Sequence, residues 1–180
     1  MASDIVCLLC LLPFIHTLQG VAISSNTGPG GVVYAGARSS LTLTNCSITA
    51  NNGSAVVFAG SSLTISGTNF TNNAAAAAVT APEAVWERNG SAGGALRLLC
   101  YEPGPGGYDN VAVISNSSFR DNQGINGGAL YAGPGTNVRL VSVLISGNKA
   151  YDGGGVFADR DACLQSMVNT TFTSNTALQR

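Results

Sequence analysis

A short motif recurs along the chain: a large apolar residue, two spacer residues and an asparagine. Successive copies begin 25, 22, 49, 26 and 27 residues apart. A repeat with a period of about 20 to 50 residues is typical of a solenoid, in which each copy forms one coil that stacks on the next. The six copies are Ile23 to Asn26, Ile48 to Asn51, Phe70 to Asn73, Phe119 to Asn122, Ile145 to Asn148 and Phe172 to Asn175.

Two further patterns accompany each motif. Apolar residues stand seven and five positions before the anchor, as at Leu41 and Leu43, and this alternation indicates a strand that buries one face. A Gly-rich turn follows the asparagine and leads into a short apolar run, as in 127–131. Runs of this length are too short for helices. We therefore expect three short strands in each coil.

Coils of this kind pair in parallel, about 4.8 Å apart, so that like residues stack on like. The pattern predicts an all-β parallel β-helix of about six coils over residues 18–180, with the six anchors in one internal row. We interpret the asparagines as structural turn residues. Asparagine tolerates left-handed backbone, and its amide can bond from coil to coil. The glycines after it allow positive φ and close approach of neighbouring coils.

The pairing of Gly-Gly-Ala-Leu with Phe-x-x-Asn resembles the repeat of the chlamydial polymorphic outer-membrane proteins. This resemblance implies a right-handed parallel β-helix, exposed at the cell surface as a passenger, commonly adhesive and usually attached to a membrane barrel. Because the chain stops at Arg180, straight after a repeat asparagine, we expect a fragment or truncated product. The residues that carry the resemblance are 93–96 and 127–130 for the first half, and 70–73, 119–122 and 172–175 for the second.

Composition agrees with an extracellular or surface-exposed solenoid. Charged residues make up 9% of the chain and hydrophobic residues 45%, which argues against disorder. The formal net charge is −1, and Lys149 is the single lysine. Without a basic patch, the sequence supports neither nucleic-acid binding nor electrostatic docking on a membrane.

Residues 1–17 form an apolar N-terminal segment with two open interpretations. The run 5–15 has the length of a signal-peptide core, and cleavage after Ala22 fits the small residues there. Against cleavage, Asp4 precedes the run without a basic residue, and residues 21–26 align with a repeat. The alternative is an apolar capping strand. The run is too short for a membrane span of about 20 residues.

The five cysteines do not fix the cellular compartment. Cys7 and Cys10 have the spacing of a metal or redox pair but lie among leucines without a second pair, so we expect no metal site and no cofactor. Cys46 is interpreted as a buried reduced thiol. Cys100 and Cys163 occupy comparable loops and are candidates for a disulfide, provided that their Cα atoms lie within about 7 Å.

Two excursions interrupt the repeat, at 74–92 and 98–109. Insertions in solenoids form external loops, and loops carry binding more often than coils do. An alternative is that the excursions pack their own aromatic residues on the coils. A second candidate surface is an aromatic stripe on the coils, formed by Tyr34, Phe58, Tyr131 and Phe157. The binding residues that we expect in the excursions are Trp86, Tyr101, Glu102 and Tyr108.

An enzyme is the weaker alternative. Glycoside hydrolysis needs two carboxylates about 5 to 10 Å apart. Asp159 and Asp161 form the only close pair and are interpreted as a solvated turn, while His16 stands in an apolar context. We therefore expect no catalytic residues and a binding module instead, with glycans or surface proteins of a host or neighbouring cell as partners. The remaining alternatives are a structural spacer in a larger surface protein and edge-to-edge self-association.

Overall fold

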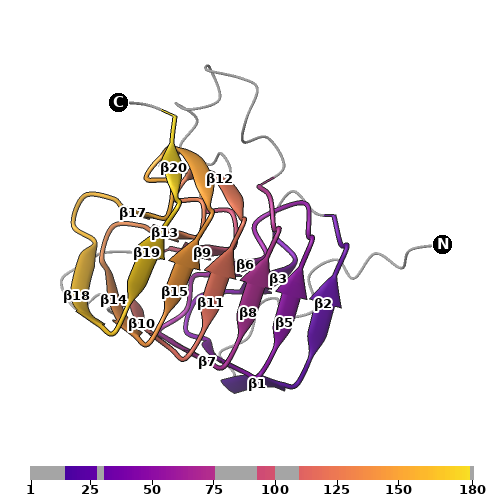
Figure 1. Cartoon of the computed structure of the whole chain (residues 1–180). Helices are drawn as coiled ribbons and strands as arrows, with labels where there is room; N and C mark the ends of the chain where they lie inside the picture. The colour runs from indigo at the N-terminus through magenta and orange to yellow at the C-terminus, as the bar shows by residue number, and fades with distance from the viewer. Residues whose placement is uncertain (1–14, 28–30, 76–92, 100–109, 179–180) are drawn as a thin grey trace.

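The computed structural model describes residues 15–27, 31–75, 93–99 and 110–178, and every regular element within them is a β-strand. The strands stack into four parallel sheets that run along one solenoid (Figure 1). Sheet A contains β1 (Ile15–Gln19), β4 (Ser40–Thr44), β7 (Ser62–Ser66), β10 (Asn110–Ser115), β14 (Thr136–Val141) and β18 (Cys163–Val168).

The other three sheets complete the coil. Sheet B contains β2 (Ala22–Ser24), β5 (Ser47–Thr49), β8 (Asn69–Thr71), β11 (Ser118–Arg120), β15 (Leu144–Ser146) and β19 (Thr171–Thr173). Sheet C contains β12 (Gln123–Asn126), β16 (Lys149–Asp152) and β20 (Thr176–Ala177). Sheet D contains β3 (Val33–Ala35), β6 (Val56–Phe58), β9 (Leu96–Leu98), β13 (Leu130–Ala132) and β17 (Val156–Ala158).

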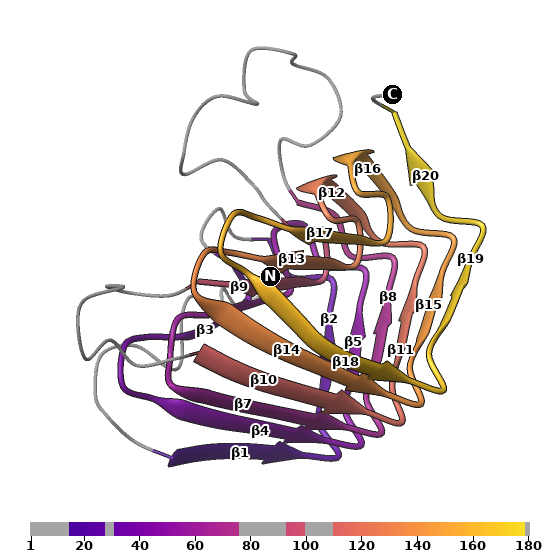
Figure 2. The same ribbon diagram turned by 90° about the vertical axis from the view of Figure 1, so that its left-hand side faces the viewer.

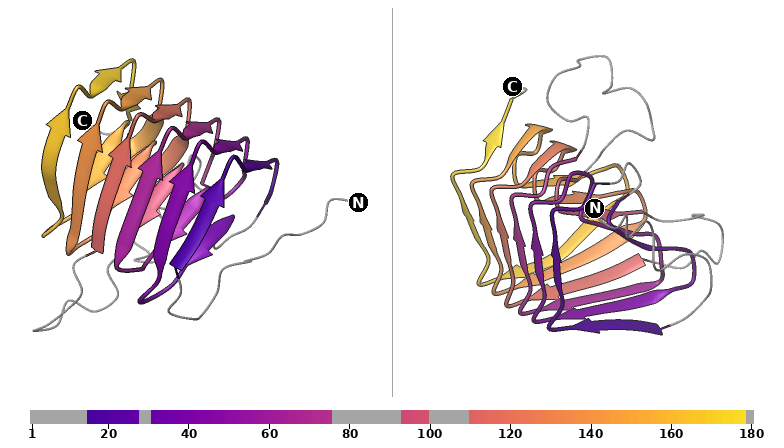
Figure 3. Two further views of the ribbon diagram at one scale, coloured as in Figure 1. Left: turned by 90° about the horizontal axis from the view of Figure 1, so that it is seen from below. Right: turned by 90° about the vertical axis from the view of Figure 1, so that its right-hand side faces the viewer.

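Each coil passes from sheet A to sheet B, then through the region of sheet C to sheet D (Figure 2). Five coils make this circuit, and a sixth is described as far as β20. Seen from its N-terminal end, the chain turns clockwise as it recedes, so the helix is right-handed (Figure 3). This is the hand that parallel crossover connections favour. The expected right-handed parallel β-helix is therefore confirmed.

Sheet C is an element that the apolar pattern did not predict. It forms regular strands in the last three coils only. Earlier in the chain the same place holds single parallel bridges, from Thr27 to Asn52, from Asn52 to Ala74 and from Ala74 to Gln123. These strands are short and contain polar residues, as in 123–126 and 149–152, so no apolar run in the sequence predicts them.

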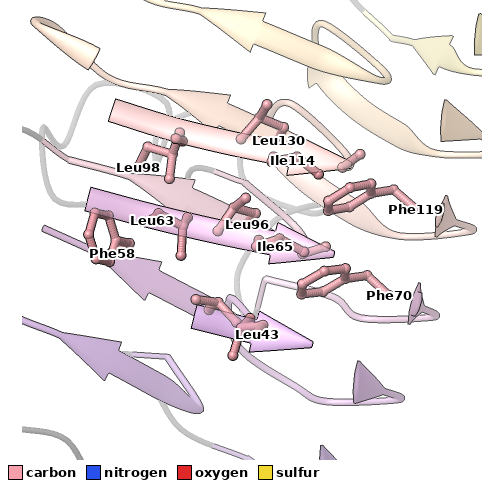
Figure 4. Packing of buried hydrophobic residues seen from close by; sticks show 14 of the residues in the cluster. Leu43, Phe58, Leu63, Ile65, Phe70, Leu96, Leu98, Ile114, Phe119 and Leu130 are labelled. Atoms are coloured by element: carbon pink, nitrogen blue, oxygen red, sulfur yellow. The ribbon is translucent and has the colours of Figure 1, made fainter. Parts of the chain in front are cut away.

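The six anchors form one row along sheet B, as the sequence predicts. Parallel pairing places Ile23 beside Ile48, Ile48 beside Phe70, and so on to Phe172. The rings of Phe70 and Phe119 stack with centroids 4.6 Å apart (Figure 4). These two residues are 49 positions apart in sequence, yet they occupy successive coils. Both excursions are therefore accommodated within a single coil step.

Sheet A, which meets sheet B at a corner of the coil, supplies two more rows of the core (Figure 2). The alternating residues expected to point inward do so and are fully buried, while their neighbours in sequence point outward. Sheet D adds two further rows, one of which contains Leu96 and Leu130 (Figure 4). The two rows of sheet A are Leu41, Leu63, Ala112 and Val138, and Leu43, Ile65, Ile114 and Leu140.

The motif asparagines form a continuous ladder of side-chain amides. In each step, the backbone N–H and the Nδ2 group of one asparagine donate to Oδ1 of the next, at 2.9 to 3.2 Å. From Asn51 onward, Nδ2 also donates to the anchor carbonyl one coil back, at 2.8 to 3.1 Å. The expected coil-to-coil bonding is confirmed, and the four inner asparagines are buried: Asn51, Asn73, Asn122 and Asn148.

The expectation that these asparagines adopt left-handed backbone is wrong. The left-handed residue is the one immediately before each, with φ between 54° and 67°, because the chain must bend before the amide can point inward. A second left-handed residue lies three positions before each anchor, with φ between 46° and 64°. The first set is Ser25, Ala50, Asn72, Asp121, Gly147 and Ser174, and the second is Gly20, Asn45, Gly67, Asn116, Ser142 and Asn169.

The glycine pair before sheet D has two separate roles. The first glycine has positive φ, as at Gly127 with 73°. The second is required by close approach, because a Cβ at Gly128 would overlap the backbone carbonyl of Gly154 in the next coil. Gly94 meets Gly128 in the same way. Both roles match the expectation from sequence.

The anchor row predicts a strong contrast between two neighbours on β11. Phe119 is buried against Phe70, whereas the next residue, Arg120, is exposed. The substitution Phe119→Asp should cost several kcal/mol, because it buries a charge without a partner. The control Arg120→Asp adds a carboxylate one residue away and should cost less than about 1 kcal/mol. Thermal and denaturant melts measure both, and equal small losses would contradict the row.

The ladder makes a second prediction about two asparagines. Asn122→Ala removes four hydrogen bonds and leaves the N–H of Asn73 and the carbonyl of Phe70 without them. At about 1 to 3 kcal/mol for each buried unpaired group, the loss should exceed about 3 kcal/mol. Asn69→Ala, which removes an exposed side-chain bond to Ser118, should cost under about 1 kcal/mol. Chemical denaturation tests this, and similar losses for both variants would refute the ladder's role.

Candidate binding face on sheet D

The outer face of sheet D carries one row of large side chains. Parallel pairing aligns the middle residues of its five strands, each of which lies between two residues that point into the core. We name this row the sheet D row. From the N-terminal to the C-terminal coil, it consists of Tyr34, Val57, Arg97, Tyr131 and Phe157.

The sequence predicted this stripe with one residue wrong. Phe58 does not belong to it: it pairs with Ala35 and Leu98, points inward and is fully buried. Val57 takes its place in the row. The error comes from the Gly-rich turn of the second coil, which was aligned one residue out of step. That alignment matched Val57 with Val33, whereas the structure pairs Val56 with Val33. A shift of one residue moves a strand side chain to the opposite face.

Aromatic rings lie along the C-terminal part of the row. The rings of Tyr131 and Phe157 stack with centroids 5.9 Å apart and planes within 7° of parallel. A Cβ at Gly133 would lie 3.2 Å from the Cε1 atom of Tyr131, and one at Gly36 would lie 3.4 Å from Cε1 of Tyr34. Each tyrosine ring therefore packs against a glycine.

The Tyr131 hydroxyl is held by Asp159, which follows β17. It donates a hydrogen bond of 2.6 Å to Oδ2 of that carboxylate. Burial raises the pKa of Tyr131 well above its ordinary value, and the hydrogen bond and the charge of Asp159 raise it further, against a smaller opposing effect of Arg97. The phenol therefore stays protonated near neutral pH and acts as a fixed donor to the carboxylate.

Arg97 is the cation of the row. It is half-buried, and burial lowers its pKa while the neighbouring Tyr131 and Tyr34 oppose this effect. Its Nε atom is buried and has no hydrogen-bond partner among the described residues. A guanidinium beside aromatic rings can receive a carboxylate or sulfate group, while the rings offer flat faces to an apolar or sugar ring.

The predicted excursion residues Trp86, Tyr101, Glu102 and Tyr108 lie outside the described residues, so their role stays a prediction. The residues that flank the excursions are placed, however. Residues 74–75 precede the first undescribed stretch, and residues 98–99 precede the second, with Leu98 in β9 itself and fully buried. Both stretches therefore adjoin β9, the strand that carries Arg97.

The two carboxylates that follow β17 have different surroundings. Asp161 is exposed in a turn with φ of 64°, and Asp159 is committed to Tyr131. Within the described ranges, no group of three or more His, Cys, Asp or Glu residues could hold a metal ion. The same ranges contain no helix long and apolar enough to cross a membrane.

One cysteine expectation can be compared with the structure. Cys46 is a buried free thiol, as expected, and its Sγ lies 3.3 Å from the carbonyl oxygen of Leu18. Cys163 is exposed at the start of β18 and is free among the described residues; its candidate partner Cys100 lies outside them, so the candidate disulfide is not tested. Residues 7, 10 and 100 lie outside the described residues.

Three members of this face were missed in the sequence: Val57, Arg97 and Asp159. The available signal was the strand pattern of an apolar residue, a large residue and a small or apolar residue, seen at 96–98, 130–132 and 156–158. Comparison of the chain with family models, with curated proteins and with solved structures finds no match in any of the three. The structure shows a right-handed β-solenoid. The resemblance described from the sequence rests on the motif residues alone and stays a prediction.

The raised pKa of Tyr131 predicts a difference in alkaline stability. A phenol whose folded pKa exceeds its unfolded value stabilises the fold below about pH 10, and this contribution is lost as the pH rises further. The melting temperature should therefore fall more for the wild type than for Tyr131→Phe between about pH 8 and about pH 11. Calorimetry at both pH values measures this, and parallel losses in the two proteins would contradict the burial of the phenol.

Proposed function

We propose that this chain is a surface-exposed or secreted β-helix module that binds a ligand in the manner of an adhesin, through the outer face of sheet D. The observation that carries the proposal is the sheet D row, with its stacked rings and its arginine. One of the two outward rows of sheet B is built differently. Five of its six positions are small hydroxyl residues: Ser24, Thr49, Thr71, Ser146 and Thr173.

Glycans are the ligand class that fits this face best. Sugar rings pack against the faces of aromatic side chains, and the spacing of neighbouring parallel strands sets a regular series of such positions. The Arg97 guanidinium would pair with an acidic substituent. Surface proteins of a host or neighbouring cell are the second class of partner, since part-buried aromatic and arginine side chains also anchor protein interfaces.

Two features support a location outside the cell. The low charge content and the Gly-, Ser-, Thr- and Asn-rich repeat are those expected of an extracellular solenoid. The motifs at 93–96, 127–130 and 119–122 also resemble those of the polymorphic outer-membrane proteins, whose passengers are commonly adhesive. The same features are compatible with a structural spacer, and the sheet D row is what favours binding over that alternative.

A glycan array tests the proposal. Labelled protein is applied to neutral glycans and to glycans that carry uronic acid, sialic acid or sulfate. Arg97→Gln and Tyr131→Leu should each weaken binding about tenfold or more, because hot-spot residues of this type contribute 2 kcal/mol or more. Arg139→Gln is the matched control, since Arg139 is an exposed arginine on sheet A, two coils after Arg97. Its binding should equal that of the wild type.

The other outcomes separate the alternatives. Equal binding by all three variants would move the site to the excursions that carry Trp86, Tyr101, Glu102 and Tyr108. In that case, replacing residues 76–92 and 100–109 by short Gly-Ser turns should abolish binding and leave the β-type circular dichroism spectrum intact, because loop length affects stability only weakly. If the folded wild type binds no glycan and no cell surface, the spacer interpretation holds.

A further inference from the structure

The asparagine ladder has a direction, and this makes the two ends of the solenoid chemically different. Every step donates from an asparagine to Oδ1 of the asparagine in the following coil. At the first coil, Oδ1 of Asn26 has no donor among the described residues. At the last coil, Asn175 donates through Nδ2 to the carbonyl of Ile145, and its backbone N–H has no acceptor among the described residues. One end thus offers an acceptor and the other offers donors.

The apolar rows also continue to both ends. On the last coil, Met167 is 51% exposed and Phe172 is 46% exposed, although their row neighbours Leu140 and Ile145 are buried. On the first coil, the residues of the same two rows are Leu18 and Ile23, which are only partly buried. Each end therefore presents two apolar rows that every inner coil buries against its neighbours.

We propose that the last coil of one copy binds the first coil of a second copy, head to tail. Strand β18 would lie beside the partner copy's β1 and β19 beside its β2, and the ladder would run on from Asn175 of one copy to Asn26 of the next. A second copy is the occupant because its first coil carries the asparagine row and the apolar rows of Leu18 and Ile23, in the same order along the chain as the inner coils, with His16 in the remaining row of sheet A.

The geometry of this contact determines the kind of assembly. The two contacting surfaces are different faces of the chain, so the interface is heterologous and leaves one free end of each type. A translation along the solenoid axis does not close into a ring, and the expected products are linear oligomers that lengthen with concentration. Arg97 on β9 and Tyr131 on β13 lie in inner coils, away from the junction. Self-association and glycan binding can therefore fail independently of each other.

Lysine substitutions can block each end separately. Ile23→Lys places a charge on the first coil and Phe172→Lys places one on the last, and at either end the lysine stem can lie on the coil while its amine reaches water. Sedimentation velocity of the 180-residue chain over a range of concentrations should show wild-type oligomers and two monomeric variants. Mixing the variants should restore a 1:1 dimer, since one intact end of each type remains. Circular dichroism and melting confirm that each variant is folded.

A second pair of variants guards against local unfolding. Leu18→Lys and Met167→Lys act on a different row of the same two ends and should behave in the same way. A folded wild type that remains monomeric at all concentrations would overturn the proposal. Variants that still associate alone, or folded variants that fail to form a dimer when mixed, would also overturn it, because only a head-to-tail junction predicts complementation. Arg97→Gln should leave the oligomer distribution unchanged.

Discussion

The structure depends on one interaction, the hydrogen bonding of buried asparagine amides from coil to coil. Each inner amide donates two hydrogen bonds and accepts two, so its bonding capacity is filled. A buried amide that lost these partners would be costly, and a coil shifted by one residue would lose them all. The ladder therefore fixes the register of the coils, which hydrophobic rows of similar residues would define less sharply.

That register places the outer face as well as the core. Before β9, β13 and β17 the chain reaches a glycine pair, and the second glycine lets neighbouring coils approach where a Cβ would meet backbone atoms. Sheet D begins immediately afterwards, so its middle residues align at the spacing of neighbouring strands. The stack of Tyr131 on Phe157 and the position of Arg97 beside them follow from this alignment. The alignment of the candidate binding face is thus set by the asparagine ladder and the glycine turns that precede sheet D.

The rows of the core could be predicted from sequence because spacing alone identifies them. Phe70 and Phe119 share a motif, and strand alternation assigns Leu41 and Leu43 to the interior. The turns were less predictable, since several residue types occupy the left-handed positions and asparagine also has a second use as an amide donor. Phe58 shows the effect: a single-residue error in aligning the turn assigned this buried residue to the outer face of sheet D. Trp86 and the other excursion residues have no repeat to align with, so no pattern locates them.

The central claim is that the ladder holds the coils in register, and amide hydrogen exchange measured residue by residue by NMR tests it most directly. The backbone N–H groups of Asn51, Asn73 and Asn122 each donate to a buried side-chain oxygen of the next coil. They should exchange as slowly as the strand amides of β8 and β11, at a rate set by global unfolding. If they exchange at the rate of exposed turn amides, such as that of Arg160, while the strands stay protected, the ladder does not hold the coils together.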